Sequence, residues 1–206
     1  MRIQLARIID EFDRAQIRVH RLSDKLTEAQ WSQRTDAARW SVAECVAHLN
    51  LTGRAYVPLI RDALEEARGR DEPSRPRYRR DPVGWMLALA MGPVPQIGRF
   101  RLGVVNTTAA FTPEWDLPRG QLIAEFDRFQ REQRGVVQEA EGCAIDRVWV
   151  RSPFDPRLRY NLYILLWLFC RDISCAMSCR RSGFGSEFRS TAGYYGSSTS
   201  RFSHGM

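Results

Sequence analysis

Only one of the three histidines of this 206-residue chain lies on a pattern that places it inside a helical protein. His48 shares a stripe with Cys45, Thr52 and Tyr56, whose spacings of three and four put them on one helix face. An inward imidazole can ligate a metal or form hydrogen bonds in a core, and a lone one more often does the second. The nearby polar residues Glu44, Asn50, Thr52 and Tyr56 form no recognised ligand set.

The remaining histidines and the five cysteines give weaker signals. His20 falls beside the apolar stripe of the first helix, which indicates a surface or boundary position, and His204 lies in the extreme tail. Cysteines occur singly at 45 and 143 and cluster at 170, 175 and 179, with no paired CxxC spacing that would indicate zinc. We therefore expect reduced thiols.

Apolar periodicity predicts two long helices in the first third of the chain. From Leu5 to Leu26 apolar residues recur every three or four positions, and a capping box at Thr27 and Gln30 predicts a short helical turn after them. A second capping box, Ser41 with Glu44, predicts the start of a long helix that ends near Gly69.

The rest of the chain predicts two more helices and an irregular tail. Residues 70–117 read as a long connection with one short helix capped by Asp81, and a third long helix is expected from about Arg119 to Ala140. A turn over 152–156 precedes an apolar helix expected from Leu158 to Cys170. The prediction is an all-α, antiparallel four-helix bundle over residues 1–170, with a long crossover between its second and third helices, and a low-complexity tail over 171–206.

Charge and hydropathy exclude several classes of function. The net charge is +7, but arginines alternate with acidic residues along the helices instead of gathering on one face with aromatic residues, so we expect no nucleic-acid partner. The longest apolar runs are too short to span a membrane, and no secretory signal opens the chain. We therefore expect a cytoplasmic protein with no membrane partner.

Three phrases give the chain a resemblance to a known family. They are LTEAQW at 26–31, WSVAECVAHL at 40–49, and SPFDP at 152–156 with RYNLY at 159–163. In this order, with an inward histidine soon after the Trp-Ser start, they resemble the DinB-like (DinB/YfiT) superfamily over roughly residues 1–163. The resemblance implies a four-helix bundle that holds a divalent metal such as zinc or nickel with three histidines. One comes from the second helix, and a His-x-x-x-His pair comes from the fourth.

Only His48 can be carried over from that implied site. Two histidines four residues apart face the same way on a helix, and a third from a facing helix completes a three-nitrogen metal site. This chain has no such pair. We therefore expect the metal site that the resemblance implies to be weak or incomplete here. Some relatives are thiol-dependent S-transferases or isomerases, while the role of others is undefined.

The change of composition after residue 163 raises the hypothesis of a shifted reading frame. Codons for Ile173 and Met177 begin with AT, and those for Asp172 and Ala176 can end in C, so a shift by one base can give histidine at both junctions. The hidden phrase, HQLRHVLQAE, would carry the missing pair on an amphipathic helix. The alternative is a genuinely divergent tail.

The sequence thus leaves open whether the chain is an enzyme. As written, it favours a DinB-like bundle of undefined biochemical role without a complete metal site. The alternative is a three-histidine S-transferase-like or isomerase-like enzyme, acting on an unknown small molecule, if the fourth helix is in frame. Because a truncated fourth helix would leave apolar stripes uncovered, we expect aggregation or a partner, with a homodimer as a candidate.

Overall fold

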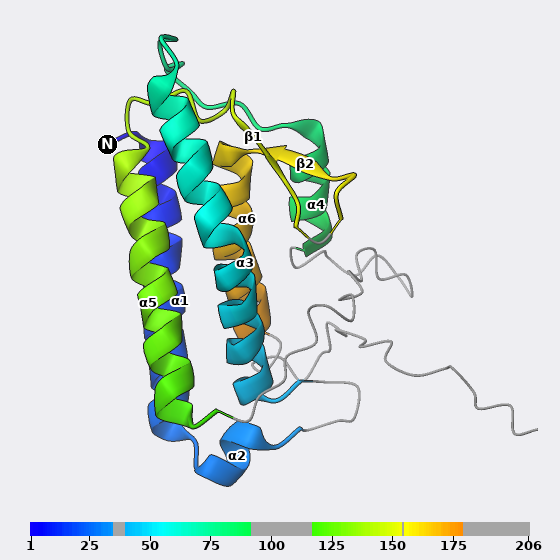
Figure 1. Cartoon of the computed structure of the whole chain (residues 1–206). Coiled ribbons are helices and arrows are strands. Elements are labelled where there is room, and N and C mark those ends of the chain that lie inside the picture. The colour runs from blue at the N-terminus through cyan, green and yellow to red at the C-terminus, as the bar shows by residue number, and fades with distance from the viewer. Residues whose placement is uncertain (35–39, 92–116, 154, 179–206) are drawn as a thin grey trace, which may run out of the picture.

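The computed structural model describes residues 1–34, 40–91, 117–153 and 155–178 (Figure 1). Helices dominate these segments, in agreement with the all-α prediction. The elements are α1 (Ile3–Lys25), α2 (Glu28–Ser32), α3 (Val42–Gly69), α4 (Pro82–Met91), α5 (Arg119–Glu139), β1 (Trp149–Arg151), β2 (Arg159–Asn161) and α6 (Leu162–Ser178). None of the described helices is long and apolar enough to cross a membrane.

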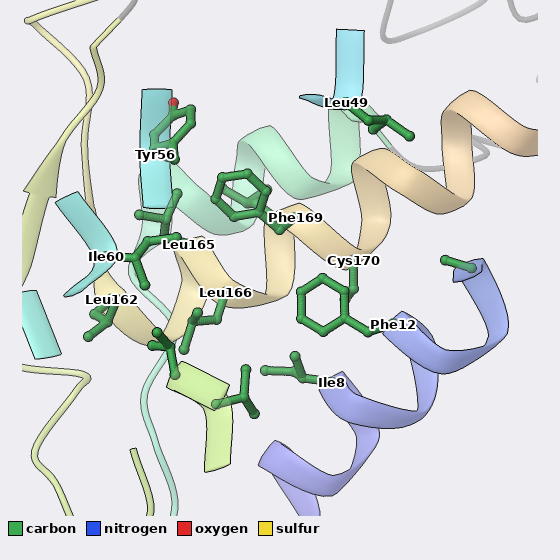
Figure 2. Packing of buried hydrophobic residues seen from close by; sticks show 14 of the residues in the cluster. Ile8, Phe12, Leu49, Tyr56, Ile60, Leu162, Leu165, Leu166, Phe169 and Cys170 are labelled. Carbon is green, nitrogen blue, oxygen red and sulfur yellow. The ribbon is translucent and has the colours of Figure 1, made fainter. Parts of the chain in front are cut away.

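Four long helices of the described segments, α1, α3, α5 and α6, enclose the core. Helix α5 packs against α1 and α3, and α6 packs against the same two helices from the other side. Figure 2 shows Ile8 and Phe12 of α1 projecting toward Leu166 and Cys170 of α6. Phe12 has no exposed surface, as the apolar periodicity of the first helix requires.

Helices α3 and α5 run parallel, and the prediction of an antiparallel arrangement is wrong for this pair. Three ion pairs link them at intervals of seven residues on both helices: Arg54–Glu125 at 2.6 Å, Arg61–Glu132 at 3.8 Å and Arg68–Glu139 at 2.6 Å. The residue numbers rise together on the two helices, which only parallel helices allow. Short loops force neighbouring helices to be antiparallel, whereas the long segment between α3 and α5 lets the chain return to the same end.

Both predicted capping boxes are present. The Ser41 hydroxyl accepts a hydrogen bond from the Glu44 backbone N–H at 3.2 Å, and the Glu44 carboxylate accepts one from the Ser41 N–H at 2.7 Å. Thr27 and Gln30 form the same reciprocal pair at the start of α2. These contacts satisfy backbone donors that the first helical turn leaves without partners, and they fix where α2 and α3 begin.

The last long helix, α6, begins and ends later than the sequence predicted. Residues 159–161, expected to be helical, form β2, which pairs antiparallel with β1, so α6 begins at Leu162 and not at Leu158. The Asn161 side chain accepts a hydrogen bond from the Ile164 N–H at 2.9 Å and thereby caps α6. Helix α6 then continues to Ser178, past the boundary predicted at residue 170. Its sequence contains no proline or glycine to end it sooner.

A buried polar network joins the short helix α4 to the start of α6. The Asp81 carboxylate accepts hydrogen bonds from the Gly84 N–H at 2.6 Å, which confirms it as the cap of α4, and from the Asn161 N–H at 3.0 Å. Gly84 faces α6 so closely that a β-carbon there would lie 2.5 Å from the Ile164 side chain. The network therefore holds α4 and the hairpin formed by β1 and β2 against α6.

Candidate functional site

His48 lies inside the protein, as predicted. Its residue is 5% exposed, whereas the His20 side chain is 42% exposed. The imidazole packs against the indole of Trp40, with ring centroids 4.9 Å apart. Trp40 immediately precedes the Ser41 cap, so the His48 ring contacts the residue that leads into α3. Of the stripe predicted to face inward, Thr52 and Tyr56 are buried, while Cys45 and Leu59 are partly buried against the core.

The carboxylate nearest to His48 along α3 is already bound. Glu44 is buried, and both of its oxygens accept hydrogen bonds from the Arg34 Nε at 3.0 Å. Burial alone would raise the pKa of Glu44, but hydrogen bonds from Arg34 and Ser41 outweigh it and hold that pKa below its usual value. Glu44 is thus a buried, ionised carboxylate held by a guanidinium and a helix cap.

The other polar residues of this region are also engaged. The Thr52 hydroxyl donates to the His48 carbonyl at 2.9 Å, within α3. The Asn50 amide donates to the Leu122 carbonyl of α5 at 2.9 Å. Both side chains therefore serve α3 itself or its contact with α5.

Tyr56 connects α3 to the hairpin. Its hydroxyl lies 3.2 Å from the Ser152 hydroxyl, and its ring meets Phe169 of α6 edge to face at 5.0 Å. Ser152 in turn accepts a hydrogen bond from the Asp155 N–H at 3.3 Å. Figure 2 shows Tyr56 and Phe169 facing one another across the α3–α6 contact. The helical periodicity predicted that Tyr56 faces inward, but this link could not be predicted because the sequence did not indicate the hairpin.

A second histidine contact was missed from the sequence. His20 Nε2 lies 2.8 Å from Asp127 Oδ1, and the Gln16 amide donates to the same oxygen at 2.8 Å. The pair joins α1 to α5 at the surface, far from the α3 stripe in sequence. Only the positions of His20 and Gln16 four residues apart, on one face of α1, could have suggested a shared partner. His204 lies outside the described residues.

The described residues do not fit the three-histidine metal site that the resemblance implies. They contain no group of three or more histidine, cysteine, aspartate or glutamate side chains that could hold a metal ion. The donor chemistry agrees with this, because Glu44 is neutralised by Arg34, and Thr52 and Asn50 bind backbone carbonyls. Positions 173 and 177, where the frame-shift hypothesis places histidines, both lie on α6, four residues apart.

Comparison with known proteins identifies the family. A search of curated proteins found no match, and a search of solved structures found none. The family model of the DinB superfamily matches residues 11–169. This match includes the later part of α1, all of α3 with its capped start and His48, all of α5, and the hairpin that leads into α6. Because the match covers most of its length, the chain belongs to the DinB superfamily.

Proposed function

We propose that the chain as written is a non-catalytic DinB-like domain, a binding or scaffold protein without a complete metal centre. The observation that carries this proposal is the engagement of the polar side chains around His48. Glu44 is paired with Arg34, and Tyr56 hydrogen-bonds with Ser152. A catalytic metal requires about three protein ligands with an open position, and His48 supplies one imidazole.

We also propose how the helices are arranged and where in the cell the protein acts. The four long helices would form a four-helix bundle whose second and third helices, α3 and α5, are joined by the crossover 70–118. The protein would act in the cytoplasm, without nucleic-acid or membrane partners. A homodimer and a small-molecule ligand remain predictions of this proposal, and sedimentation of the purified protein tests the first of them.

The alternative function is a metal-dependent enzyme in a chain whose fourth helix is read in the other frame. It is favoured by the helical backbone of α6 at positions 173 and 177, which would place both hidden histidines on a regular helix that packs against α3. A divalent metal held by them and His48 would lower the pKa of a bound thiol or water, as thiol transfer or isomerisation requires. Sequencing the gene decides whether the codons permit histidine at both positions.

Metal analysis of purified protein separates the two functions. We expect the chain as written to bind zinc or nickel weakly, with no difference between the wild type and His48→Ala. His20→Ala is the matched control, because His20 lies outside the α3 stripe. The frame-restored chain should bind about one metal per chain, and His48→Ala should abolish that binding. Stoichiometric metal that depends on His48 in the chain as written would overturn the proposal.

A further inference from the structure

We propose that the β1–β2 hairpin carries a binding site for a doubly charged oxyanion, formed by Arg151 and Arg159. The two residues are direct cross-strand partners in the register of the hairpin. Both are exposed, while the neighbouring pair, Val150 and Tyr160, is buried on the opposite face of the strands. The two guanidinium groups therefore start from adjacent positions on one solvent-facing surface.

The backbone hydrogen bonds show that these two arginines form the more closely spaced of the two kinds of cross-strand pair. Ser152 N–H donates to Leu158 O at 2.9 Å, and Leu162 N–H donates to Val148 O at 2.9 Å. Hydrogen-bonded and non-hydrogen-bonded pairs alternate along an antiparallel ladder. Arg151 and Arg159 consequently occupy a non-hydrogen-bonded pair, the kind with the shorter separation of about 4.5 Å between α-carbons.

Two like charges at such a position destabilise a hairpin unless something neutralises them. Neither arginine forms an ion pair with any residue in the described part of the chain, in contrast to the arginines along the α3–α5 contact. The nearest carboxylate in sequence, Asp155, is occupied, because Arg157 contacts its two oxygens at 2.9 and 2.8 Å. The positive charge of the Arg151–Arg159 pair is thus left for a ligand to balance.

The surroundings of the pair add positive charge and an aromatic surface. Trp149 is 46% exposed and, two residues before Arg151, lies on the same face of β1. The Asn161 amide donates to the Arg79 carbonyl at 2.8 Å, which holds the exposed Arg79 and Arg80 segment beside β2. Arg80 is a further cation, so it cannot neutralise the two hairpin arginines. Its guanidinium stacks over Trp167 at 4.9 Å.

The chemistry of this surface selects the class of ligand. A guanidinium presents paired donors that match the oxygens of phosphate and carboxylate groups. Two guanidiniums side by side favour an anion that carries nearly two charges, and a phosphate monoester fulfils this at neutral pH. The exposed indole of Trp149 offers an apolar or aromatic part of the same molecule a place to pack. We therefore assign the site to a small phosphorylated compound, and inorganic phosphate is its simplest probe.

Phosphate titrations of the full chain test the site, with melting temperature and calorimetry as the readouts. Phosphate should raise the melting temperature of the wild type more than chloride at equal ionic strength does. Arg151→Gln and Arg159→Gln should each weaken the apparent phosphate affinity about tenfold or more, since each removes a charged hydrogen-bonding partner. Arg131→Gln is the matched control, because Arg131 is an exposed arginine on α5 without an ion pair among the described residues, and it should keep the wild-type affinity.

A second readout distinguishes a binding site from general charge effects. Without phosphate, Arg151→Gln and Arg159→Gln should melt at a higher temperature than the wild type, because each relieves the repulsion across the hairpin. Arg131→Gln should not show this increase. Equal phosphate affinity in the wild type and both hairpin variants, or an equal effect of chloride, would overturn the proposal.

Discussion

Gly53 of α3 lies directly against the ring of Phe129 of α5. A β-carbon at Gly53 would come within 2.8 Å of Phe129 Cγ, closer than real β-carbons approach other atoms. Both residues are buried, and Phe129 belongs to the inward face of α5. The contact lies beside the ion pair of Arg54 with Glu125. The absence of a side chain at residue 53 therefore sets how closely the two parallel helices pack.

Gly53→Ala should destabilise the protein even though alanine favours helices. The better helix propensity contributes about 1 kcal/mol, but overpacking against Phe129 costs about 1–3 kcal/mol. Gly135→Ala on α5 is the control, because its nearest neighbour would be 3.8 Å away, and it should gain about 1 kcal/mol. Urea unfolding of the two variants measures the difference. A Gly53→Ala protein as stable as Gly135→Ala would show that α3 and α5 are not in close contact.

Phe12→Ala and Phe126→Ala should each lower the free energy of unfolding by about 3–5 kcal/mol. Phe12 of α1 is 0% exposed and Phe126 of α5 is 1% exposed, so either truncation leaves a cavity in the core. Ile17→Ala serves as the control on α1, because Ile17 is 52% exposed, and it should change stability little. Thermal melts of the three variants provide the measurement, and losses as small as that of Ile17→Ala would contradict the burial.

Glu44 should make the stability depend on pH in the acidic range. Burial alone would raise its pKa in the folded protein, but the interactions with Arg34 and Ser41 together outweigh burial and hold that pKa below the ordinary value. The ionised carboxylate therefore stabilises the fold above its unfolded pKa of about 4.5, and this contribution is lost as the pH falls through the folded pKa. Melting temperatures of the wild type and Glu44→Gln should differ most near neutral pH and converge in acid. Curves that stay parallel would exclude Glu44 as the source.

Asp81→Ala should destabilise the protein by about 1–3 kcal/mol or more, since it removes the acceptor of two buried backbone N–H groups. These groups belong to Gly84 at the start of α4 and to Asn161 at the start of α6. Asp71→Ala, in an exposed stretch of the same connection, is the control and should be close to neutral. Hydrogen exchange provides a local readout, in which the Asn161 amide loses protection. Unchanged exchange at Asn161 would argue against the network.

Much of the helical framework could be predicted from the sequence because each helix carries its own signals. The stripe from Leu5 to Leu26 and the capping boxes at Thr27 and Ser41 are local patterns, and α1, α2 and α3 begin and end close to the predicted positions. The buried position of His48 followed from the same periodicity. Local patterns are reliable where the physical cause lies within one or two helical turns.

The hairpin and the relative directions of the helices could not be predicted, because they depend on contacts between residues that are distant in sequence. Strands of three residues, such as Trp149–Arg151, are too short to show an alternating pattern. The parallel arrangement of α3 and α5 becomes visible only when Arg54 is matched with Glu125 and Arg68 with Glu139. For the same reason, the link from Tyr56 to Ser152 and the pairing of His20 with Asp127 could not be read from one sequence.

The order in which the helices surround the core constrains how the chain can fold. Helices α1 and α3 come from the first 69 residues, and each packs chiefly against α5 and α6 from the later part of the chain. Stabilising contacts therefore form only after the ends of a long loop meet, and α3 alone extends about 42 Å over its 28 residues. Such a topology has a high contact order, so it should fold more slowly than a bundle of consecutive hairpins. Neither half can bury its apolar face alone, and a chain severed within the crossover would regain structure only when its two fragments associate.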